Sequence, residues 1–417
     1  MVRERRLLVA LPITGLTTSY CAHPLPATHH CVQCQMRTAC SFFPVQNMSA
    51  KQNKLFGIPV TTTATLAFLS ANAHAQSSVT LYGELDTGLA YVSNVSGNAQ
   101  YKATAGLIDG SYWGLEGSED LAGGNKAIFR LERGLSVTTG EGLNDHPYYV
   151  GLANETYGTV TLGQQYDSIH DYFAPFTLTG GAGGTAFAHP FDNDNANNSY
   201  LARNSIKYAG PSIGGFSFGG MYAFSNAAGQ FANNRAYSVG ANYQNGPFNA
   251  GAAYLHVNGR GNTLGGAYDT VNLPGSNRDI FEANAQTQNT YGVGASYAVG
   301  DFTLGAAWSR STYSGVTDAD SGSALPSAGF SNYEINGVYQ LTPAMSLAGM
   351  YTYTKGSGAH WHQGALQAVY GLSKRTDTYL ETVYQRASSG PPVVINTSDP
   401  SAGRSQLLVA AGIRHRF

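Results

Sequence analysis

The sequence has no cysteine after residue 40, because its four cysteines stand at positions 21, 31, 34 and 40. A long stretch without cysteine has no disulfide framework and is compatible with an oxidising compartment. The "CVQC" stretch has histidines nearby, but the second tight cysteine pair of a zinc finger is lacking. We therefore expect no metal site and interpret residues 1–47 as an upstream extension that is not part of the working protein.

Charged residues are scarce as well. They make up 12% of the chain, and the formal net charge is -2. Nucleic-acid partners are not supported, because binding to phosphates requires an excess of Lys and Arg. Disorder is also excluded, since a disordered chain has few aromatic residues, whereas 12% of this chain is aromatic.

Long hydrophobic runs are missing after residue 75, so no spanning helix is predicted there. A shorter apolar stretch, 55–69, follows Lys51 and Lys54 and precedes "ANAHA", which together form the three parts of a secretory signal. Pro59 interrupts this stretch, which argues against a transmembrane anchor. We expect a signal peptide over 48–75 and an exported body over 76–417, with 17 basic and 24 acidic side chains and a formal charge of -7.

Glycine, tyrosine and phenylalanine are abundant, with 51, 27 and 18 residues. After residue 75, segments of about ten residues alternate with the period of two that is typical of β-strands. The apolar face of one such segment consists of Val79, Leu81, Leu85, Leu89 and Tyr91. The segments 216–225 and 332–341 alternate in the same way, and the opposite face is polar or small.

Short and long connectors alternate between these segments. The short ones, such as "EDLAGGN" and "YQNGP", contain turn residues, and the long ones, such as 92–109, 167–200, 259–288 and 387–403, are rich in Gly, Asn, Asp and Ser. Roughly sixteen strands fit the exported length, and short turns on one rim with long loops on the other are typical of an outer-membrane barrel. A soluble β-sandwich is the alternative, but so few aliphatic residues would hold such a large sandwich together poorly.

The last twelve residues, "QLLVAAGIRHRF", form an alternating strand that runs to the final residue. Leu407, Val409, Ala411 and Ile413 share one face, and Arg414 and Arg416 lie on the other. We expect this strand to pair with the first strand, because a sheet crosses lipid only when it has no free edge. The fold class is therefore all-β, a sixteen-stranded antiparallel transmembrane β-barrel.

Several stretches carry a resemblance to a known family. "QSSVTLYGELDTGL", "SYWGLEGSEDLAGGNKAIFRLE", "YYVGLANETYGTVTLGQQYD", "RNSIKY" and the terminal Phe417 are similar to the trimeric general-diffusion porins of Gram-negative outer membranes, of the betaproteobacterial type. The resemblance covers 76–417 and is densest from 76 to 210. It implies a homotrimer in contact with outer-membrane lipid and lipopolysaccharide, and an insertion machinery that recognises Phe417.

The family resemblance also implies that the third long loop folds into the lumen and that its acids face a basic ladder on the wall. The loop corresponds to Asp167 to Ser199, so Asp192 and Asp194 on the loop and Arg203 on the wall match the family pattern. An Asx-rich turn held by its own side chains explains Asp192 and Asp194 equally well. A calcium loop is not expected, because the sixth-position glycine and twelfth-position glutamate are missing.

Departures from the family pattern bear on ion selectivity. Tyr112 and Gln164 stand where the family often has arginine, so two rungs of the basic ladder are missing. Arg130, which alternation places on the same face as Lys126 and Glu132, compensates for some of this charge. Glu116 should face the lumen as well. We expect weak selectivity that leans to cations.

No enzymatic motif was found: the sequence lacks a Walker-type phosphate loop, a GxSxG elbow and an HExxH helix. His170 next to Asp171 has no accompanying nucleophile, so we interpret the pair as polar loop residues. We expect a passive channel for small hydrophilic solutes and ions, without a cofactor. A sugar-selective channel with lumen tyrosines such as Tyr82 and Tyr112 is the first alternative, and a barrel enzyme is the second.

Overall fold

The computed structural model describes residues 77–143, 146–259, 285–317, 323–324, 326–356, 358–389 and 393–417. The expected extension 1–47 and signal peptide 48–75 lie outside the described residues, as does most of the long connector 259–288. The chain divides into two units, Met1–Ser70 and Ala71–Phe417, and all described residues belong to the second.

One antiparallel sheet of eighteen strands makes up almost the whole unit. The strands are β1 Ser78–Val95, β2 Asn98–Ala105, β3 Tyr112–Asp120, β4 Asn125–Leu135, β5 Gly142–Leu143, β6 Tyr148–Asn154, β7 Gly158–Gln165, β8 Ala202–Ala209, β9 Phe216–Ala223, β10 Ala236–Asn245, β11 Phe248–Asn258, β12 Thr287–Val299, β13 Phe302–Ser314, β14 Ala328–Thr342, β15 Met345–Gly356, β16 Ala359–Gly371, β17 Thr376–Ala387 and β18 Ser405–Arg416.

The barrel nevertheless has sixteen transmembrane strands, as the sequence predicts. β2 and β3 pair one after the other with the same long strand β1. Together they form one transmembrane strand of the barrel, which is interrupted at 106–111. β5 and β6 pair in the same way with β4. Apart from the closing pair β1 and β18, all other neighbours are consecutive in the chain.

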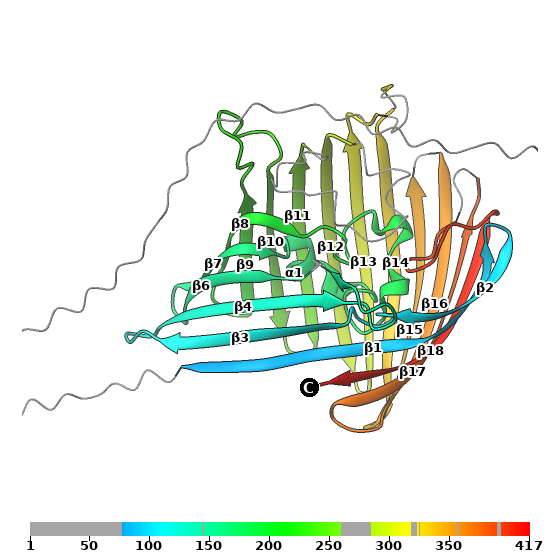
Figure 1. Ribbon diagram of the computed structural model, residues 1–417, viewed down its shortest axis with the longest axis horizontal. Helices are drawn as coiled ribbons and strands as arrows, with labels where there is room; N and C mark the ends of the chain where they lie inside the picture. Colours follow the sequence, from blue (N-terminus) through cyan, green and yellow to red (C-terminus); the bar gives the residue numbers. More distant parts are fainter. Residues whose placement is uncertain are drawn as a thin grey trace, which may run out of the picture. The chain divides into compact units, whose positions relative to one another are not determined.

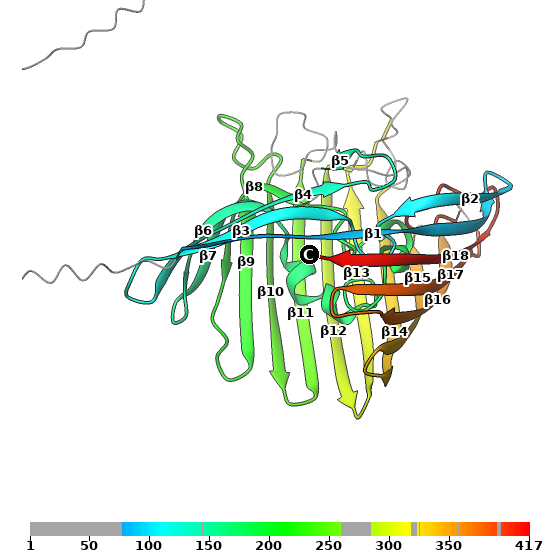
Figure 2. The same ribbon diagram turned by 60° about the horizontal axis from the view of Figure 1, so that its bottom comes forward.

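The first and last strands close the barrel. β1 and β18 are antiparallel partners from Glu84 opposite Arg416 to Val92 opposite Leu408, and they lie side by side in both ribbon views (Figures 1 and 2). The register continues through the terminal residue, because Phe417 N donates to Gly83 O at 3.0 Å and Gly83 N donates to Phe417 O at 3.3 Å. Closure satisfies the backbone groups that an open edge would expose to lipid.

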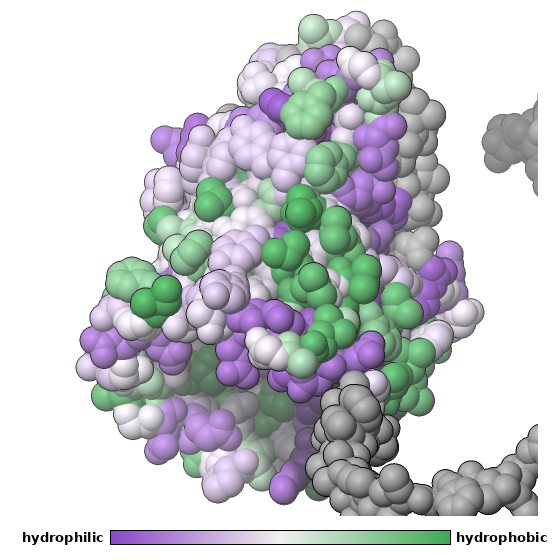
Figure 3. All heavy atoms as spheres, turned by 90° about the vertical axis from the view of Figure 1, so that its left-hand side faces the viewer, coloured by the Kyte–Doolittle hydropathy of each residue, from purple (hydrophilic) through white to green (hydrophobic). Residues whose placement is uncertain are grey.

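The apolar sets predicted from alternation point outward. Val79, Leu81 and Leu89 on β1 are exposed, whereas Glu84 and Asp86 between them are buried. Tyr333 and Ile335 on β14 show the same contrast with Glu334. On the face shown in Figure 3, hydrophobic side chains gather across the middle of the view and hydrophilic ones border them. This is the arrangement of a barrel with a lipid-facing wall.

The connectors follow the predicted alternation with one exception. Tight turns at 121–124, 246–247 and 300–301 join strands on one rim, as expected. The connector expected over 92–109 is instead mostly a β-hairpin of β1 and β2, so that prediction was wrong. Ser96 and Gly97 both have positive φ, 48° and 95°, which allows the two-residue turn that matches the twist of a hairpin.

Among the residues that the structure describes, helical structure is confined to the long connector 166–201 between β7 and β8. It comprises α1 Ser168–Tyr172 and three 3-10 turns, η1 Ala174–Phe176, η2 Thr185–Phe187 and η3 Pro190–Asp192. Within the described ranges, no helix has the length and apolar character needed to cross a membrane.

The closing contact yields a prediction about assembly. Deleting Phe417 removes the two backbone hydrogen bonds to Gly83, and we expect it to reduce the folded fraction in the outer membrane while the channels that do fold keep their conductance. The folded fraction can be measured by heat-modifiable electrophoretic mobility. The control is Phe417→Tyr, which keeps the ring and the backbone. Normal assembly of the deletion variant would contradict the prediction.

Candidate functional site

The connector 166–201, called the lumen loop below, packs against the inner face of the wall. Asp167 caps α1 by accepting a hydrogen bond from Ile169 N at 2.5 Å, and its other oxygen accepts from Asn195 Nδ2 at 2.6 Å. Burial raises the pKa of Asp167 to about 6. The side chains of Lys207 and Asp171 form an ion pair of 2.5 Å that holds α1 to β8. The start of the loop is thus fixed by polar contacts to its own end and to the wall.

Aromatic side chains of the lumen loop rest on glycines of the wall. Phe173 lies on Gly292 and Phe176 on Gly294 and Gly251; a Cβ atom at Gly251 would stand 2.5 Å from Phe176 Cε2. Tyr172 packs on Gly240 in the same way. Glycine is required here for close approach, because any side chain would push the aromatic rings away from the wall. These contacts between rings and glycines were not predicted from the sequence, where their one signal is glycine recurring on the inward positions of neighbouring strands.

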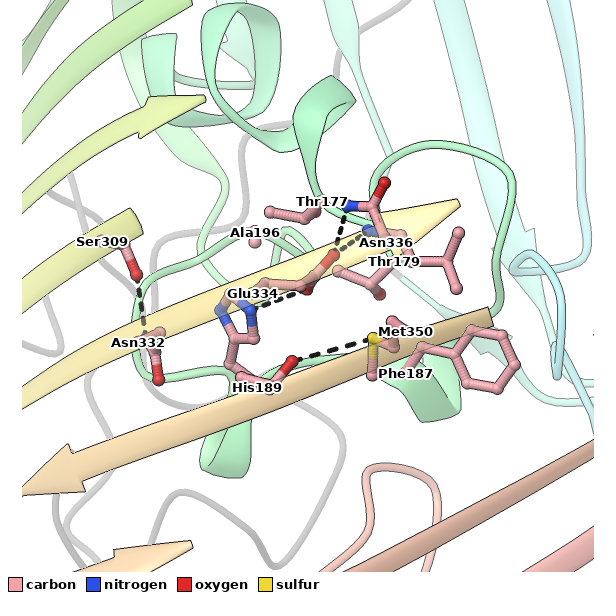
Figure 4. A network of polar contacts seen from close by, with 12 residues as sticks. Thr177, Thr179, Phe187, His189, Ala196, Ser309, Asn332, Glu334, Asn336 and Met350 are labelled. Carbon is pink, nitrogen blue, oxygen red and sulfur yellow. Dashed lines mark hydrogen bonds and ion pairs between the residues drawn. The ribbon is translucent and has the colours of Figure 1, made fainter. Parts of the chain in front are cut away.

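A buried ionic triad, His189, Asp194 and Glu334, joins the lumen loop to β14. His189 Nδ1 lies 2.7 Å from an Asp194 oxygen, and His189 Nε2 lies 2.9 Å from a Glu334 oxygen. Figure 4 shows Glu334 reaching from its strand toward His189. Burial alone would lower the pKa of His189, but the Asp194 and Glu334 carboxylates outweigh it and raise the pKa to about 10. The imidazole is therefore a buried cation between two carboxylates.

Wall residues complete the partners of this triad. The Ser309 hydroxyl donates to the Asp194 carboxylate, and Asn332 Nδ2 donates to the same carboxylate at 3.2 Å. The second oxygen of Glu334 accepts from Leu178 N at 2.7 Å and from Asn336 Nδ2 at 2.6 Å. Since every charged group has partners, the desolvation cost of burying the triad is offset.

The structure places Asp192 and Asp194 inside the loop rather than at its surface. Both side chains are buried. Asp192 accepts hydrogen bonds from Asn197 N at 2.9 Å and Ser199 N at 3.0 Å, and Asp194 accepts from Ala196 N at 3.4 Å. This is the geometry of the Asx-turn interpretation, in which the acids fold the chain. Burial, and then the charge of Asp194, raise the pKa of Asp192 to about 7.

Arg130 and its acids form a polar cluster on β3 and β4. Its guanidinium lies 3.2 Å from Glu132 and 3.6 Å from Glu116, and 5.4 Å from the centre of the Tyr82 ring. Tyr82 donates to Glu132 at 2.5 Å. The side chains of Glu116 and Arg130 are 50% and 34% exposed, so they are the accessible charges of this cluster.

A second ionic cluster lies beside the closing seam. Arg414 and Arg416 on β18 contact both Asp377 on β17 and Glu84 on β1, with nitrogen to oxygen distances of 3.0 to 3.7 Å. Alternation along the last strand predicted that the two arginines point inward. Their partners were not predicted, because residues 84, 377 and 414 come together only through the pairing of β1, β17 and β18.

The remaining predicted lumen residues lie at different positions along the barrel wall. Tyr112 on β3 packs against His146 with a tilted ring, and the ring centres are 4.8 Å apart. Gln164 donates to His146 O at 2.8 Å. Lys126 is exposed, one residue into β4 beside the tight turn, and Arg203 is half-buried at the start of β8. The structure thus brings together Arg130, Glu116 and Glu132, but Lys126 lies at the rim.

A second connector also contacts the interior, which the sequence analysis did not predict. Val393, Val394 and Ile395, between β17 and β18, are buried. Asn396 Nδ2 donates to Thr185 O of the lumen loop at 2.9 Å. Lys102 Nζ donates to Thr397 O at 2.6 Å. The inner surface is therefore not uniformly polar, because apolar side chains fill the places where connectors rest on the wall.

In the described part of the chain, no group of three or more His, Cys, Asp or Glu side chains is arranged to hold a metal ion. The His170 and Asp171 side chains, 3.2 Å apart, join the Lys207 ion pair.

The triad predicts a large stability effect. Replacing the buried cation by His189→Gln leaves the buried acids Asp194 and Glu334 without a counter-charge, which should lower the free energy of unfolding by about 3–5 kcal/mol. The matched control is His170→Gln, a partly exposed loop histidine, which should cost below about 1 kcal/mol. Urea unfolding of the refolded protein measures both, and equal effects would refute a special role for the triad.

The raised pKa of Asp192 predicts a pH dependence. The folded state favours the protonated acid, so this stabilisation is fully present below the ordinary pKa of 3.8 and is lost as the pH rises through about 7. Asp192→Asn does not titrate, so its stability relative to the wild type should improve across this pH range. Unfolding at several pH values tests this, with the exposed turn variant Asp301→Asn as control. Parallel pH profiles for the wild type and Asp192→Asn would contradict it.

Comparison with known proteins gives consistent matches. The profile described as Gram-negative porin matches residues 61–390. An outer membrane porin protein of Bordetella pertussis is 31% identical over 60% of this chain and 68% of its own length. Outer membrane porin protein 32 of Delftia acidovorans is 29% identical over 84% of this chain and 98% of its own length. The solved anion-selective porin from Comamonas acidovorans aligns with a TM-score of 0.68 and 25% identity, over 82% of this chain and all of that chain.

Proposed function

Because this chain belongs to the Gram-negative porin family, we propose that its channel is narrowed by the lumen loop and discriminates only weakly between ions, with a lean to cations. The chain is an outer-membrane porin, and its barrel is a water-filled channel for passive diffusion of small hydrophilic solutes. The narrowing, the selectivity and the subunit number are the parts that we propose.

The pairing of wall charges is the observation that carries the selectivity proposal. Arg130 lies between Glu116 and Glu132, and Arg414 and Arg416 contact Glu84 and Asp377. Each arginine that faces the lumen in these clusters has carboxylate partners, so no unopposed basic ladder forms. Most of the field cancels over short distances, and the exposed Glu116 remains as the accessible acid.

Anion preference is the second candidate. The solved Comamonas porin is anion-selective. In this chain the side chain of Arg416 is 39% exposed, whereas those of its partners Glu84 and Asp377 are 5% and 9% exposed. An ion passing this seam would therefore meet guanidinium groups before carboxylates. The two candidates differ in the sign of the reversal potential.

Planar-bilayer recording under a salt gradient distinguishes the two candidates. We expect a small reversal potential of cationic sign, which Arg130→Gln should increase and Glu116→Gln should reduce, because each variant removes one accessible charge. Lys126→Gln, at the rim, is the control and should have a smaller effect. Strong chloride preference in the wild type would overturn the proposal.

We further infer a homotrimer, which the family resemblance implies. Current steps in groups of three during insertion would support it, and consistently single steps would argue against it. Sugar selectivity is less favoured, since the Tyr82 hydroxyl is committed to Glu132. Enzymatic activity is less favoured as well, because the relatives are channels.

A further inference from the structure

One histidine of the lumen loop reaches the water of the lumen. His170 lies on α1, and its side chain is 38% exposed, whereas Ile169 and Tyr172 on the same helix are buried against the wall. The barrel encloses α1 (Figure 1), so the exposed surface of His170 is lumen surface. Among the residues that the structure describes, the other histidines are buried or lie on the outer wall: His146, His189, His256, His360, His362 and His415.

Contacts on two sides fix the position of the His170 ring. It stacks on Tyr166, with ring centres 4.1 Å apart and an interplanar angle of 23°, and its Nδ1 lies 3.2 Å from an Asp171 oxygen. Lys207 Nζ lies 2.5 Å from the other Asp171 oxygen and donates to Tyr166 O at 3.0 Å. A charge on the imidazole therefore has a defined place in the lumen.

The charges in contact with His170 cancel only while its ring is neutral. Asp171 and Lys207 are a pair of opposite charges. Burial alone would raise the pKa of Asp171, but its hydrogen bond with His170 and the charge of Lys207 outweigh burial and lower that pKa. Asp171 thus stays ionised between about pH 5 and pH 8, the range in which histidine changes its charge. A proton on His170 gives the three side chains one net positive charge.

Few other ionisable groups lie around α1. Asp167, which caps this helix, is buried, and burial raises its pKa to about 6. Tyrosine side chains such as Tyr149 and Tyr166 do not ionise in this pH range. β9 to β12 pack on the other side of α1 and have no ionisable side chain on their described inner faces. Since Asp167 has no exposed surface, His170 is the titrating group that passing ions meet.

Cross-strand pairing places His170 at a depth similar to that of the Arg130 cluster. The row of paired residues that begins at Arg130 on β4 crosses β6 and β7 and ends at Ser205 on β8. Lys207 is the next inward residue of β8. Three strand spacings of about 4.8 Å span this row, which gives about 14 Å. Ions that pass Arg130 and Glu116 therefore also meet the field of His170, because the Debye length is about 10 Å at 0.1 M salt.

We propose that His170 is a specificity-determining residue of the channel, and that its protonation in acidic medium shifts the ion preference from cations toward anions. The added charge attracts small anions, both inorganic ions and carboxylates, and repels cations. In neutral medium the ring is uncharged, and the exposed Glu116 is the accessible charge that decides the preference. The inference rests on the proposed weak cation preference and adds its dependence on pH.

Reversal potentials at about pH 8 and about pH 5 test this role, because histidine gains its proton between these values. Wild type and His170→Gln are inserted into planar bilayers under a potassium chloride gradient, with about 0.1 M salt on the dilute side. Acidification should lower the ratio of cation to anion permeability about twofold more in the wild type than in His170→Gln, since one charge acts weakly through water. His170→Arg, which is always charged, should already have the lowered ratio at neutral pH.

A matched control and a change of salt separate charge from structure. His362→Gln removes a histidine from the outer wall of β16, so its pH response should equal that of the wild type. Wild-type single-channel conductance of His170→Gln at neutral pH would show that the variant is folded. At about 1 M salt the Debye length falls to about 3 Å, so the difference between wild type and His170→Gln should nearly vanish.

Three results would overturn the role of His170. They are equal pH responses of the wild type and His170→Gln, a wild-type permeability ratio for His170→Arg at neutral pH, and a difference that persists unchanged at high salt, which would point to an altered fold. Strong chloride preference of the wild type at neutral pH would instead overturn the proposed cation preference. The pH response of His170→Gln relative to the wild type is measured independently of that sign.

Discussion

The pairing of backbone groups within lipid is the constraint on which the rest of this structure depends. A strand that crosses a membrane has no water to bond its peptide groups, so the sheet must close on itself. Here closure pairs β1 with β18, which lie more than three hundred residues apart in the sequence, and the pairing extends through Phe417 to Gly83. Once the sheet is closed, alternation divides the side chains into a lipid face and an interior, and function is confined to the interior.

The interior combines two kinds of interaction that fix the lumen loop. Aromatic rings of the loop rest on glycines of β10 to β12, where a Cβ atom would collide with them. Farther along, the triad of His189, Asp194 and Glu334 binds the loop to β14 through charges that are buried and paired. The first interaction sets how close the loop lies to the wall, and the second sets its position along the wall. The arginines of the two lumen clusters, Arg130, Arg414 and Arg416, have acid partners, and we propose that this pairing limits the net field.

Much of the fold follows from the sequence, because period-two alternation and turn residues are local signals. Tyr333 and Ile335 revealed the lipid face of β14 without any knowledge of its partners, and the tight turns were located by Gly, Pro, Asn and Asp. The hairpin at 92–109 was missed, because its Gly and Asn residues read equally well as a loop.

The candidate site was less predictable, because its contacts join residues far apart in the chain. Asp192 and Asp194 match a family pattern. The same sequence pattern is compatible with acids that are exposed to the lumen and with acids that hold the turns of their own loop. Asp194 is buried against Ser309 and Asn332, more than a hundred residues away, and His189 links it to Glu334. The contacts between loop aromatic rings and wall glycines were not predicted for a similar reason. Glycine inside a strand only weakens the strand signal, and its role becomes clear once the ring that packs on it is known.

The central claim is that the polar inner face lines the conducting path while the apolar face meets lipid. Because no cysteine follows residue 40, single cysteines introduced into the barrel can be modified selectively. The most direct measurement is single-channel conductance during treatment with a charged, membrane-impermeant thiol reagent. We predict that Glu116→Cys channels change conductance stepwise and that Leu366→Cys channels, on the outer wall, do not. An unaffected Glu116→Cys channel, or a modified Leu366→Cys channel, would contradict the account.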